Sequence, residues 1–425
     1  MRIAETYQAP FVERSGFDAD LTLEERGIVE AVHRFSREVL RPLGRKLDRM
    51  SAADVAAPGS PLFGAYVEFA KLGIDPLMLD SMAPDAASRL ECLIMEEIGW
   101  GDGGLGVSLA VAAFPLQVAH ASGKKELVEL ATGRIGCWPI TQPDHGSDFV
   151  DTLNRERQQH VKTSPGNLSA KFSKDEIVIN GQTSAWVSNG PVAQIASLCC
   201  PADFGDGIVR ADGVRNMAVM IVPLDLKGVS RGMPLEKMGQ NALPQGEIFF
   251  DNVRIPRRWA VAEEASGAAG FLSILAMAGV FMSQCFTGVA RAAFELALDY
   301  AHERKQGGEL LIRHQLVRWR IGEMYKKVEA ARAMTRRASL YLRAAPAPHP
   351  NVSSMSKAFV TQAAFEVASE AVQILGGAGL TKEYEAEKLF RDARTALIED
   401  GENYFLTLRL GTVLSDLYDQ GWTRN

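Results

Sequence analysis

The sequence predicts a mainly α-helical protein with a central β-barrel or β-sandwich, and three observations lead to this prediction. Apolar residues recur at helical spacing in the first third of the chain and again in the last third. Between these stretches lie short segments that are rich in β-branched residues and are separated by turn residues. The length of 425 residues exceeds what a single hydrophobic core usually holds. We therefore expect three units, at residues 1–134, 135–262 and 263–425.

The first unit is expected to be helical. Thr22 followed three residues later by Glu25 is a capping-box pattern, which marks the N-terminus of a helix. The Ala- and Pro-rich segment 52–61 is expected to be a loop. The apolar residues after the capping box recur at spacings of four, three and four, namely Ile28, Val32, Phe35 and Val39.

At least five short strands are expected in the second unit, with no helical stretch between them. The second candidate leads into a predicted turn at Asn180-Gly181, and the fifth precedes Asp251-Asn252. Short strands at irregular spacing are typical of a small antiparallel barrel or sandwich. The candidates are 136–141, 176–179, 194–199, 217–222 and 247–250.

The third unit is expected to be an antiparallel four-helix bundle, because long helical segments are joined by short connections. Residues 265–290 carry no charge and are long enough to cross a bilayer. This run begins with Ser and Gly residues and continues into an amphipathic helix, so we expect a helix buried in the bundle and no membrane span. The helical segments are 265–305, 314–345, 352–374 and 382–419, with breaks at 307–308, 346–350 and 376–379.

Composition excludes several classes of protein. Apolar residues make up 47% and charged residues 23%, which is typical of a chain that builds a folded core. The net charge of −6 supplies no basic surface for nucleic acid. Five cysteines without C-x-x-C spacing or a nearby histidine pair predict reduced thiols and no metal site. The first twenty residues contain four acids and no continuous apolar run, so we expect a cytoplasmic protein.

Two candidate binding segments follow predicted strands. Residues 140–148, ITQPDHGSD, form either a turn that leaves a barrel strand or a place where small side chains and backbone N–H groups admit a flat, polar-edged ligand. In the second segment, 185–190, Trp186 precedes Ser188 by two positions, so that on a strand both side chains point to one face. This pair is either a core Trp beside a surface Ser or a stacking surface for a ring with nitrogen acceptors, such as an isoalloxazine.

Two further segments lie in the third unit. Residues 373–380, QILGGAGL, match neither a Walker loop nor the G-x-G-x-x-G fingerprint. Their glycines either stop a helix or let a pyrophosphate approach the backbone. Residues 397–403, LIEDGEN, place three acids within four positions of an otherwise apolar stretch. These acids form either a solvated loop or, if one of them enters an apolar cavity, a base whose pKa is raised.

The order and spacing of these segments resemble the acyl-CoA dehydrogenase family of flavoenzymes over nearly the whole chain. The family's T-E-P-x-x-G-S-D motif stands here as Thr141 to Asp148, its W-[IV]-[TS]-N-G as Trp186 to Gly190, and its Q-[IV]-x-G-G-x-G as Gln373 to Gly379. Glu387 to Ala393 and Glu247 to Pro256 are similar to further family signatures. The resemblance implies a helical N-terminal domain, a β-barrel and a C-terminal four-helix bundle, assembled as a homodimer or homotetramer.

The resemblance also implies FAD as the cofactor. In the family the tryptophan of the second motif covers the flavin, the hydroxyl at Ser188 hydrogen-bonds near its N5, and the glycines of the third motif approach the FAD of a neighbouring subunit. Ser147 and Gly401 are the implied substrate contacts, and no metal is implied. The cofactor-binding positions carried over are Trp138, Ile140, Thr141, Gly146, Ser147, Trp186, Ser188, Arg304, Gln315, Gln373, Gly376 and Gly377.

The implied catalytic base is an aspartate in place of the family's usual glutamate. A count without gaps from the glycine motif puts the base at Asp400, and Gly401 keeps its place after it, so Asp400 is preferred over the preceding Glu399. The family's alternative position for the base falls near Ala278, which cannot serve.

Other positions also depart from the family pattern. Gln142 replaces the usual glutamate of the first motif. The arginine that commonly lies beside acyl-CoA is absent from the apolar run 276–280, which puts recognition of a CoA thioester in doubt. The phenylalanine of the family's R-x-x-F-G segment is missing from residues 304–308.

The resemblance implies α,β-dehydrogenation of an acyl-CoA thioester. Asp400 would remove the α proton, hydride would pass to flavin N5, and electrons would leave to an electron-transfer flavoprotein. Two alternatives stay open, namely a flavin oxidase of the same fold that acts on a non-CoA substrate such as a nitroalkane, and a non-catalytic flavin-binding protein. In the nitroalkane-oxidising relative an arginine lies seven residues beyond the base, where this chain has Thr407, with Arg409 two positions further.

Overall fold

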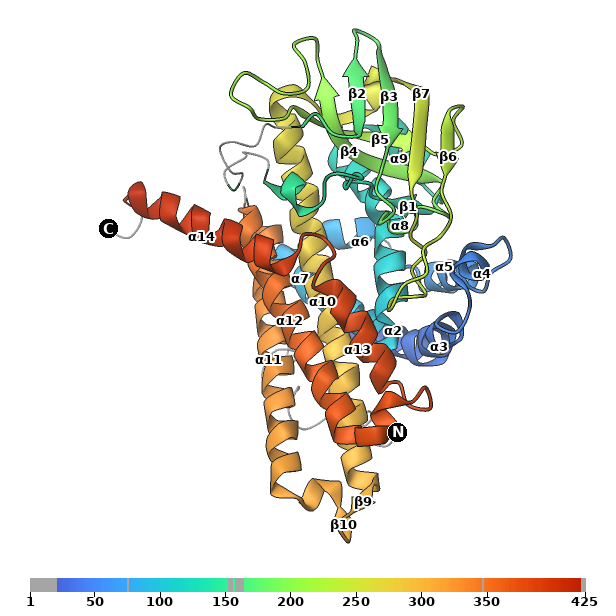
Figure 1. Ribbon diagram of the computed structural model, residues 1–425, viewed down its shortest axis with the longest axis vertical. Helices are drawn as coiled ribbons and strands as arrows, with labels where there is room; N and C mark the ends of the chain where they lie inside the picture. Colours follow the sequence, from blue (N-terminus) through green and yellow to red (C-terminus); the bar gives the residue numbers. More distant parts are fainter. Residues whose placement is uncertain (1–20, 75, 152–155, 157–163, 346–347, 422–425) are drawn as a thin grey trace.

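A curled sheet lies at one end of a long helical bundle, and a layer of N-terminal helices packs along the side of the bundle (Figure 1). This computed structural model describes residues 21–74, 76–151, 156, 164–345 and 348–421. The acidic first twenty residues, on which the expected cytoplasmic location rests, lie outside the described residues. The mainly α fold with a central curled sheet is the predicted one.

The N-terminal layer begins as the sequence predicts. Thr22 caps α2 with both hydrogen bonds of a capping box, and Val32 and Phe35 are buried. Segment 52–61 is not wholly a loop, because Ser51 caps a short helix within it, α4, by accepting a hydrogen bond from the Asp54 N–H. The helices are α2 (Leu23–Phe35), α3 (Arg41–Leu47), α4 (Ala52–Ala56), α5 (Leu62–Ala70), α6 (Pro76–Asp80), α7 (Pro84–Gly101), α8 (Gly103–Ala121) and α9 (Lys125–Ala131), and a π-helical turn, Ser36–Leu40, joins α2 to α3.

The sheet has eight strands in the order β6-β7-β3-β2-β4-β5-β8, and β1 also pairs with β4. Most pairs are antiparallel, as expected, but β1 and β2 run parallel to β4, so the sheet is mixed. The sequence analysis did not predict β2, β6 or β8. The first predicted strand, 136–141, is shorter than expected, because β1 has only two residues. The strands are β1 (Gly136–Cys137), β2 (Leu168–Phe172), β3 (Glu176–Gln182), β4 (Ile195–Asp203), β5 (Met217–Pro223), β6 (Val229–Arg231), β7 (Ile248–Pro256) and β8 (Ala260–Ala262).

The predicted turn at Asn180-Gly181 is wrong. Strand β3 continues through these residues and pairs with β7, with a register shift between Ile179 and Gly181. A Cβ on Gly181 would lie 1.9 Å from the carbonyl oxygen of Asn167, and its φ is +114°. Glycine is therefore required here because the neighbouring chain passes close to it at a bulge. Strand β7 likewise runs on through Asp251-Asn252.

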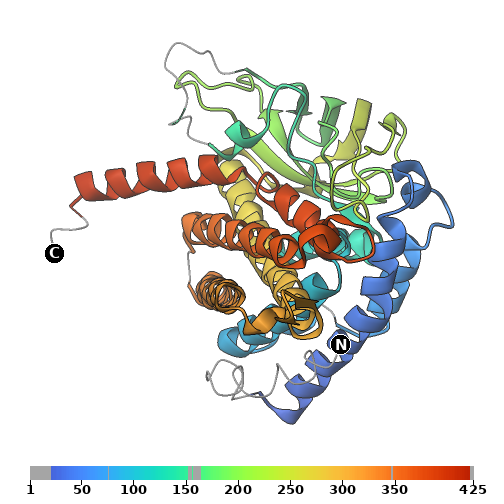
Figure 2. The same ribbon diagram turned by 60° about the horizontal axis from the view of Figure 1, so that its bottom comes forward.

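The C-terminal bundle follows the predicted helical segments closely. Its first three helices are α10 (Gly267–Glu303), α11 (Gln315–Ala344) and α12 (Pro350–Leu375). The last predicted segment is a pair of helices, α13 (Ala386–Ala396) and α14 (Asn403–Asp419). Figure 2 shows α14 extending away from the rest of the molecule. A hairpin of β9 (Lys305–Gln306) and β10 (Glu309–Leu310) joins α10 to α11.

Two apolar helices are long enough to cross a membrane by length and composition, namely α8 and the segment 264–303 that contains α10. More than half of the most apolar window of each is buried inside the structure. From Phe281 to Phe294 α10 is buried on every side, in one hydrophobic cluster with residues of α7, α11, α12 and α13. This packing is the arrangement that the sequence predicts for the uncharged run.

Candidate active site

The predicted base lies in the connection between α13 and α14. Asp400 has φ +51° and Gly401 has φ +93°, so the chain reverses direction through two left-handed residues. The Asn403 N–H closes the turn by donating to the Leu397 carbonyl at 3.0 Å. A left-handed conformation is unfavourable for a residue other than glycine, and such residues gather at functional sites.

The two adjacent carboxylates of this turn differ in their surroundings. Glu399 Oε2 accepts a hydrogen bond from Gln240 Nε2 at 2.7 Å. Within the part of the chain that the structure describes, the Asp400 carboxylate has no hydrogen-bond partner, and its side chain is half-buried. Burial raises the pKa of Asp400 to about 6, against the opposing effect of Lys357. Asp400 is therefore the carboxylate of this pair that no hydrogen bond among the described residues holds in place.

Lys357 of α12 donates hydrogen bonds to the turn, and the sequence analysis did not identify it. Its fully buried Nζ donates to the Gly401 carbonyl at 2.7 Å and to Asn403 Oδ1 at 2.9 Å. Burial lowers the pKa of Lys357 to about 8, although the carboxylates of the turn oppose this. A signal was present, because Lys357 is the one charged residue between His349 and Glu366 in an otherwise uncharged stretch.

The part of the chain that contains the sheet, called the β domain below (residues 135–262), contacts the same turn through Ser147. The Ser147 Oγ accepts a hydrogen bond from the Glu402 backbone N–H at 3.0 Å. The structure thus brings together Asp400 and the two predicted substrate contacts, Ser147 and Gly401, although they come from different domains.

The strand-end motif before Ser147 divides into buried and accessible residues. Thr141 is half-buried, its hydroxyl bonds the Ser184 hydroxyl, and its carbonyl accepts from the Ser184 N–H at 2.8 Å. Ile140 is half-buried and Gly146 is exposed. The side chain of Trp138, by contrast, is 6% exposed and its indole N–H points to Cys199 Sγ, so this ring belongs to the core.

The second motif forms a loop between β3 and β4 and not the strand on which the sequence argument placed it. Asn189, at φ +62°, fixes this loop to α8 because its side-chain Nδ2 donates to the Ser108 carbonyl at 2.8 Å. Trp186 is 62% exposed, and the Ser188 hydroxyl is half-buried and accepts from Gln245 Nε2 at 3.2 Å. An exposed indole beside a hydroxyl offers a flat ligand both a stacking surface and a polar contact.

The remaining predicted cofactor residues lie far from this surface. Arg304 and Gln315 flank the β9–β10 hairpin, which Figure 1 shows at the opposite end of the long axis from the sheet. Gln373, Gly376 and Gly377 lie at the end of α12, where a ring contact between Tyr300 and Tyr384 ties the following segment to the last turns of α10. All five are exposed, and a Cβ on either glycine would meet no atom within 4 Å. One chain therefore does not bring the two sets of residues together.

Gln142 shows how this chain accommodates its departure from the first motif. Its buried Oε1 accepts from the N–H groups of Asn167 and Leu168, and its Nε2 donates to the Leu168 carbonyl at 3.0 Å. The acceptor role is one that a glutamate oxygen can also fill. The side chain thus anchors the start of β2.

The described residues offer no metal centre. No group of three or more His, Cys, Asp or Glu side chains among them could hold a metal ion. The five cysteines are buried and form no disulfide, and burial raises the pKa of Cys92 and of Cys199 to about 12.

Comparison with known proteins gives full-length matches. Benzylmalonyl-CoA dehydrogenase from Aromatoleum aromaticum is 28% identical over 94% of this chain and 100% of its own length. Cyclohex-1-ene-1-carbonyl-CoA dehydrogenase from Syntrophus aciditrophicus is 27% identical over 93% of this chain and 91% of its own. A glutaryl-CoA dehydrogenase from Mycobacterium smegmatis in complex with FADH2 has a TM-score of 0.76 at 23% identity, with 94% of this chain and 96% of that chain covered.

The fold is shared with an enzyme of different chemistry as well. An active-site mutant of nitroalkane oxidase crystallized with 1-nitrooctane has a TM-score of 0.79 at 18% identity, covering 92% of this chain and 95% of that one. Two family models match the chain: the acyl-CoA dehydrogenase middle domain over residues 137–253 and the acyl-CoA dehydrogenase C-terminal domain over residues 266–414. Together they cover more than half of the sequence, and the chain belongs to the acyl-CoA dehydrogenase family.

Proposed function

We propose that this enzyme removes the α proton of an acyl-CoA thioester with Asp400 and so carries out α,β-dehydrogenation. The family is FAD-dependent. The observation that carries the proposal is the half-buried Asp400 carboxylate, which has no hydrogen-bond partner among the described residues and lies in a turn whose Glu402 N–H donates to the Ser147 hydroxyl.

The residues around the exposed Trp186 fit an isoalloxazine ring. The indole supplies a stacking surface, the Ser188 hydroxyl supplies a polar contact, and Gly146 leaves open space where a side chain would stand. These residues would hold the ring on the domain that contains the sheet, and Ser147 of the same domain contacts the 397–403 turn. FAD, when bound, accepts the hydride that leaves the β carbon.

The residues of this chain meet the two requirements of the proton transfer. An unactivated α C–H is a very weak acid, so the thioester carbonyl must be polarised, and the backbone N–H of the base residue is the family's donor for this. The Asp400 carboxylate must also be ionised and dry. A pKa near 6 leaves it ionised at neutral pH, and the half-buried turn limits the access of water.

An apolar cavity of about 670 Å³ supports an acyl group of substantial size. It lies among α7, α8, α10, the end of α11 and the edge of the sheet, and its lining includes Ile98, Ala110, Phe114, Met277 and Phe281. Phe114 packs edge to face on Phe281 and lies in one apolar cluster with Trp138 and with Leu406 of α14. Two relatives are named for ring-containing acyl-CoA substrates, and we infer a branched or cyclic acyl group here.

We further propose a homodimer or homotetramer in the cytoplasm that passes electrons to an electron-transfer flavoprotein. Arg304, Gln315, Gln373, Gly376 and Gly377 would then contact the FAD of a second copy. These residues lie at the opposite end of the bundle from Trp186. One FAD molecule therefore could not contact both groups of residues within a single copy, which supports this arrangement.

Anaerobic titration of the purified yellow protein tests the proposed reaction. A panel of straight-chain, branched and cyclic acyl-CoAs is added, and flavin bleaching is followed by absorbance. We expect at least one branched or cyclic thioester to bleach the flavin. Bleaching by nitroalkanes alone would favour the oxidase, and a protein that never takes up FAD would favour the non-catalytic alternative.

A further inference from the structure

The carboxylate beside the base is part of a buried polar network. Glu399 Oε2 accepts from Gln240 Nε2 at 2.7 Å, and Gln240 is itself 1% exposed with φ +51°. Glu399 and Gln240 are 159 positions apart in the sequence. A single hydrogen bond therefore joins two left-handed segments, one at Gln240 and one at Asp400, and each is strained for a residue other than glycine.

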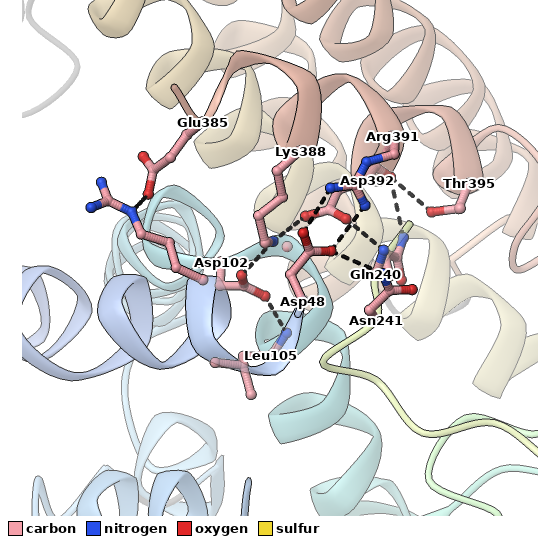
Figure 3. A network of polar contacts seen from close by, with 12 residues as sticks. Asp48, Asp102, Leu105, Gln240, Asn241, Glu385, Lys388, Arg391, Asp392 and Thr395 are labelled. Carbon is pink, nitrogen blue, oxygen red and sulfur yellow. Dashed lines mark hydrogen bonds and ion pairs between the residues drawn. The ribbon is translucent and has the colours of Figure 1, made fainter. Parts of the chain in front are cut away.

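On one side Gln240 is fixed by an ion cluster (Figure 3). Its backbone N–H donates to Asp392 of α13. Lys388, one turn earlier on the same helix, bonds Asp392 and also Asp102 at 2.6 Å. Asp102 in turn caps α8 by accepting from the Leu105 N–H at 2.8 Å. The family signature Glu387 to Ala393 thus supplies a rigid, paired support for Gln240.

The segment that contains Gln240, residues 237–245, also contacts Ser188, which is part of the surface proposed for the flavin. Lys237 Nζ donates to the Gln240 carbonyl at 3.1 Å, to the Leu243 carbonyl at 2.7 Å and to Gln245 Oε1 at 2.9 Å. Gln245 Nε2 then donates to Ser188 Oγ at 3.2 Å. An unbroken series of hydrogen bonds therefore runs from Ser188 to the turn that carries Asp400.

We infer that Glu399 is a positioning residue: its hydrogen bond to Gln240 holds the Asp400 turn in register with Ser188. The inference rests on the proposed function, because register matters only if Asp400 and the Ser188 surface act on one substrate. The two carboxylates differ in their contacts, because Gln240 holds Glu399 Oε2 while Asp400 has no hydrogen-bond partner among the described residues.

The electrostatics of Glu399 agree with a role that depends on geometry. Burial, with a contribution from Asp400, raises the pKa of Glu399 to about 7, and burial lowers the pKa of the facing Lys237 to about 8. Lys357 is the other cation that acts on Glu399. Both protonation states of the carboxyl group keep an oxygen that can accept from Gln240, so the bond persists when the charge changes.

Two substitutions at Glu399 distinguish the effect of its hydrogen bond to Gln240 from the effect of its negative charge. Glu399→Gln removes the charge but keeps an acceptor oxygen at the same reach. Glu399→Asp keeps the charge but shortens the side chain so that it no longer reaches Gln240. Glu383→Gln, an exposed acid on the segment before α13, is the control for loss of a carboxylate.

The measurements are the rate of flavin bleaching by a bound acyl-CoA, the pH profile of that rate, and hydrogen exchange of the peptide 397–403 in the holoenzyme. We expect Glu399→Gln to stay within about twofold of the parent and Glu399→Asp to lose about tenfold or more, with faster exchange of the turn, because small misplacement of a catalytic group is costly. Equal loss in both variants, or loss in Glu399→Gln alone, would show that the charge is used and would overturn the inference.

Hydrogen exchange keeps this test distinct from the test of the proposed function. If no acyl-CoA bleaches the parent protein, the proposed function fails, yet exchange of residues 397–403 still reports whether Glu399 holds the turn. Unchanged exchange in Glu399→Asp would overturn the positioning role in that case too.

Discussion

Lys357 Nζ lies 2.7 Å from the carbonyl oxygen of Gly401, so a buried ammonium on α12 supports the residue directly after the base. This contact fixes the turn mechanically and also places a positive charge close enough to lower the pKa of Asp400.

Replacing Lys357 with methionine should alter both the turn and the base. The Gly401 carbonyl and Asn403 Oδ1 lose a donor, which should cost about 1–3 kcal/mol in the free energy of unfolding. Because Lys357 lowers the pKa of Asp400, its removal should move the acidic limb of the rate profile to higher pH. Chemical denaturation and a pH–rate profile measure the two effects. Lys326→Met, at an exposed lysine paired with Glu323, is the control, and an unmoved limb in Lys357→Met would contradict the electrostatic role.

The rate of the parent enzyme should depend on pH through Asp400. A base must be ionised to accept a proton, so the rate should fall as the pH drops through about 6 and level off above it. The neighbouring Glu399, with a pKa raised to about 7, could be confused with the base. The profile of Glu399→Gln distinguishes the two groups, because the limb near 6 should persist in this variant. Its disappearance would assign the titration to Glu399.

Two tryptophans of the predicted flavin site should respond oppositely to removal. Trp138→Ala empties a core position that is 6% exposed and should cost about 3–5 kcal/mol of stability. Trp186→Ala removes a mostly exposed ring, should change stability by no more than about 0.5 kcal/mol, and should weaken FAD binding. Urea unfolding measures the stability of each variant, and titration of the apoprotein with FAD measures its affinity for the cofactor. Undiminished FAD affinity in Trp186→Ala would contradict its role as a stacking surface.

Gln142 should matter for folding through its acceptor oxygen. Gln142→Leu leaves the half-buried N–H group of Asn167 and the buried N–H group of Leu168 without that acceptor and should lower the free energy of unfolding by about 1–3 kcal/mol. Gln142→Glu keeps the acceptor and should be milder while its carboxyl group is neutral, whereas the ionised form would bury a charge against the Leu168 carbonyl. Urea unfolding at a pH where the glutamate is neutral compares the two variants, and equal destabilisation there would contradict the role of the acceptor oxygen.

The helical parts of the fold could be predicted because their signal is local. The apolar spacing of 265–305 and 314–345 gives α10 and α11 to within two residues at each end. The strands were harder, because β6 and β8 have three residues each and exist by pairing with β7 and β5. The turn prediction at Gly181 failed because the local sequence does not show which chain lies beside it. Glycine is needed there because the Asn167 backbone passes too close for a side chain.

The candidate site could be predicted only in part. Asp400 is recognisable from an acid cluster at a fixed distance from a glycine motif, and Ser147 from its own motif. Lys357 and Gln240 were missed because their partners lie 44 and 159 positions away and the contacts form only on folding. Trp138 stays a predicted cofactor-binding position, and the structure adds that its indole packs on Phe114 and donates to Cys199 Sγ, contacts that only folding creates.

The rate of flavin reduction in Asp400→Asn tests the central claim most directly. The variant is loaded with FAD, mixed anaerobically with an acyl-CoA that bleaches the parent protein, and followed by stopped-flow absorbance, with ligand-induced spectral change as the check that the thioester still binds. If Asp400 removes the α proton, binding should persist while reduction slows by about a thousandfold or more, since an amide cannot accept that proton. Reduction at the parent rate would contradict the assignment of Asp400 as the base.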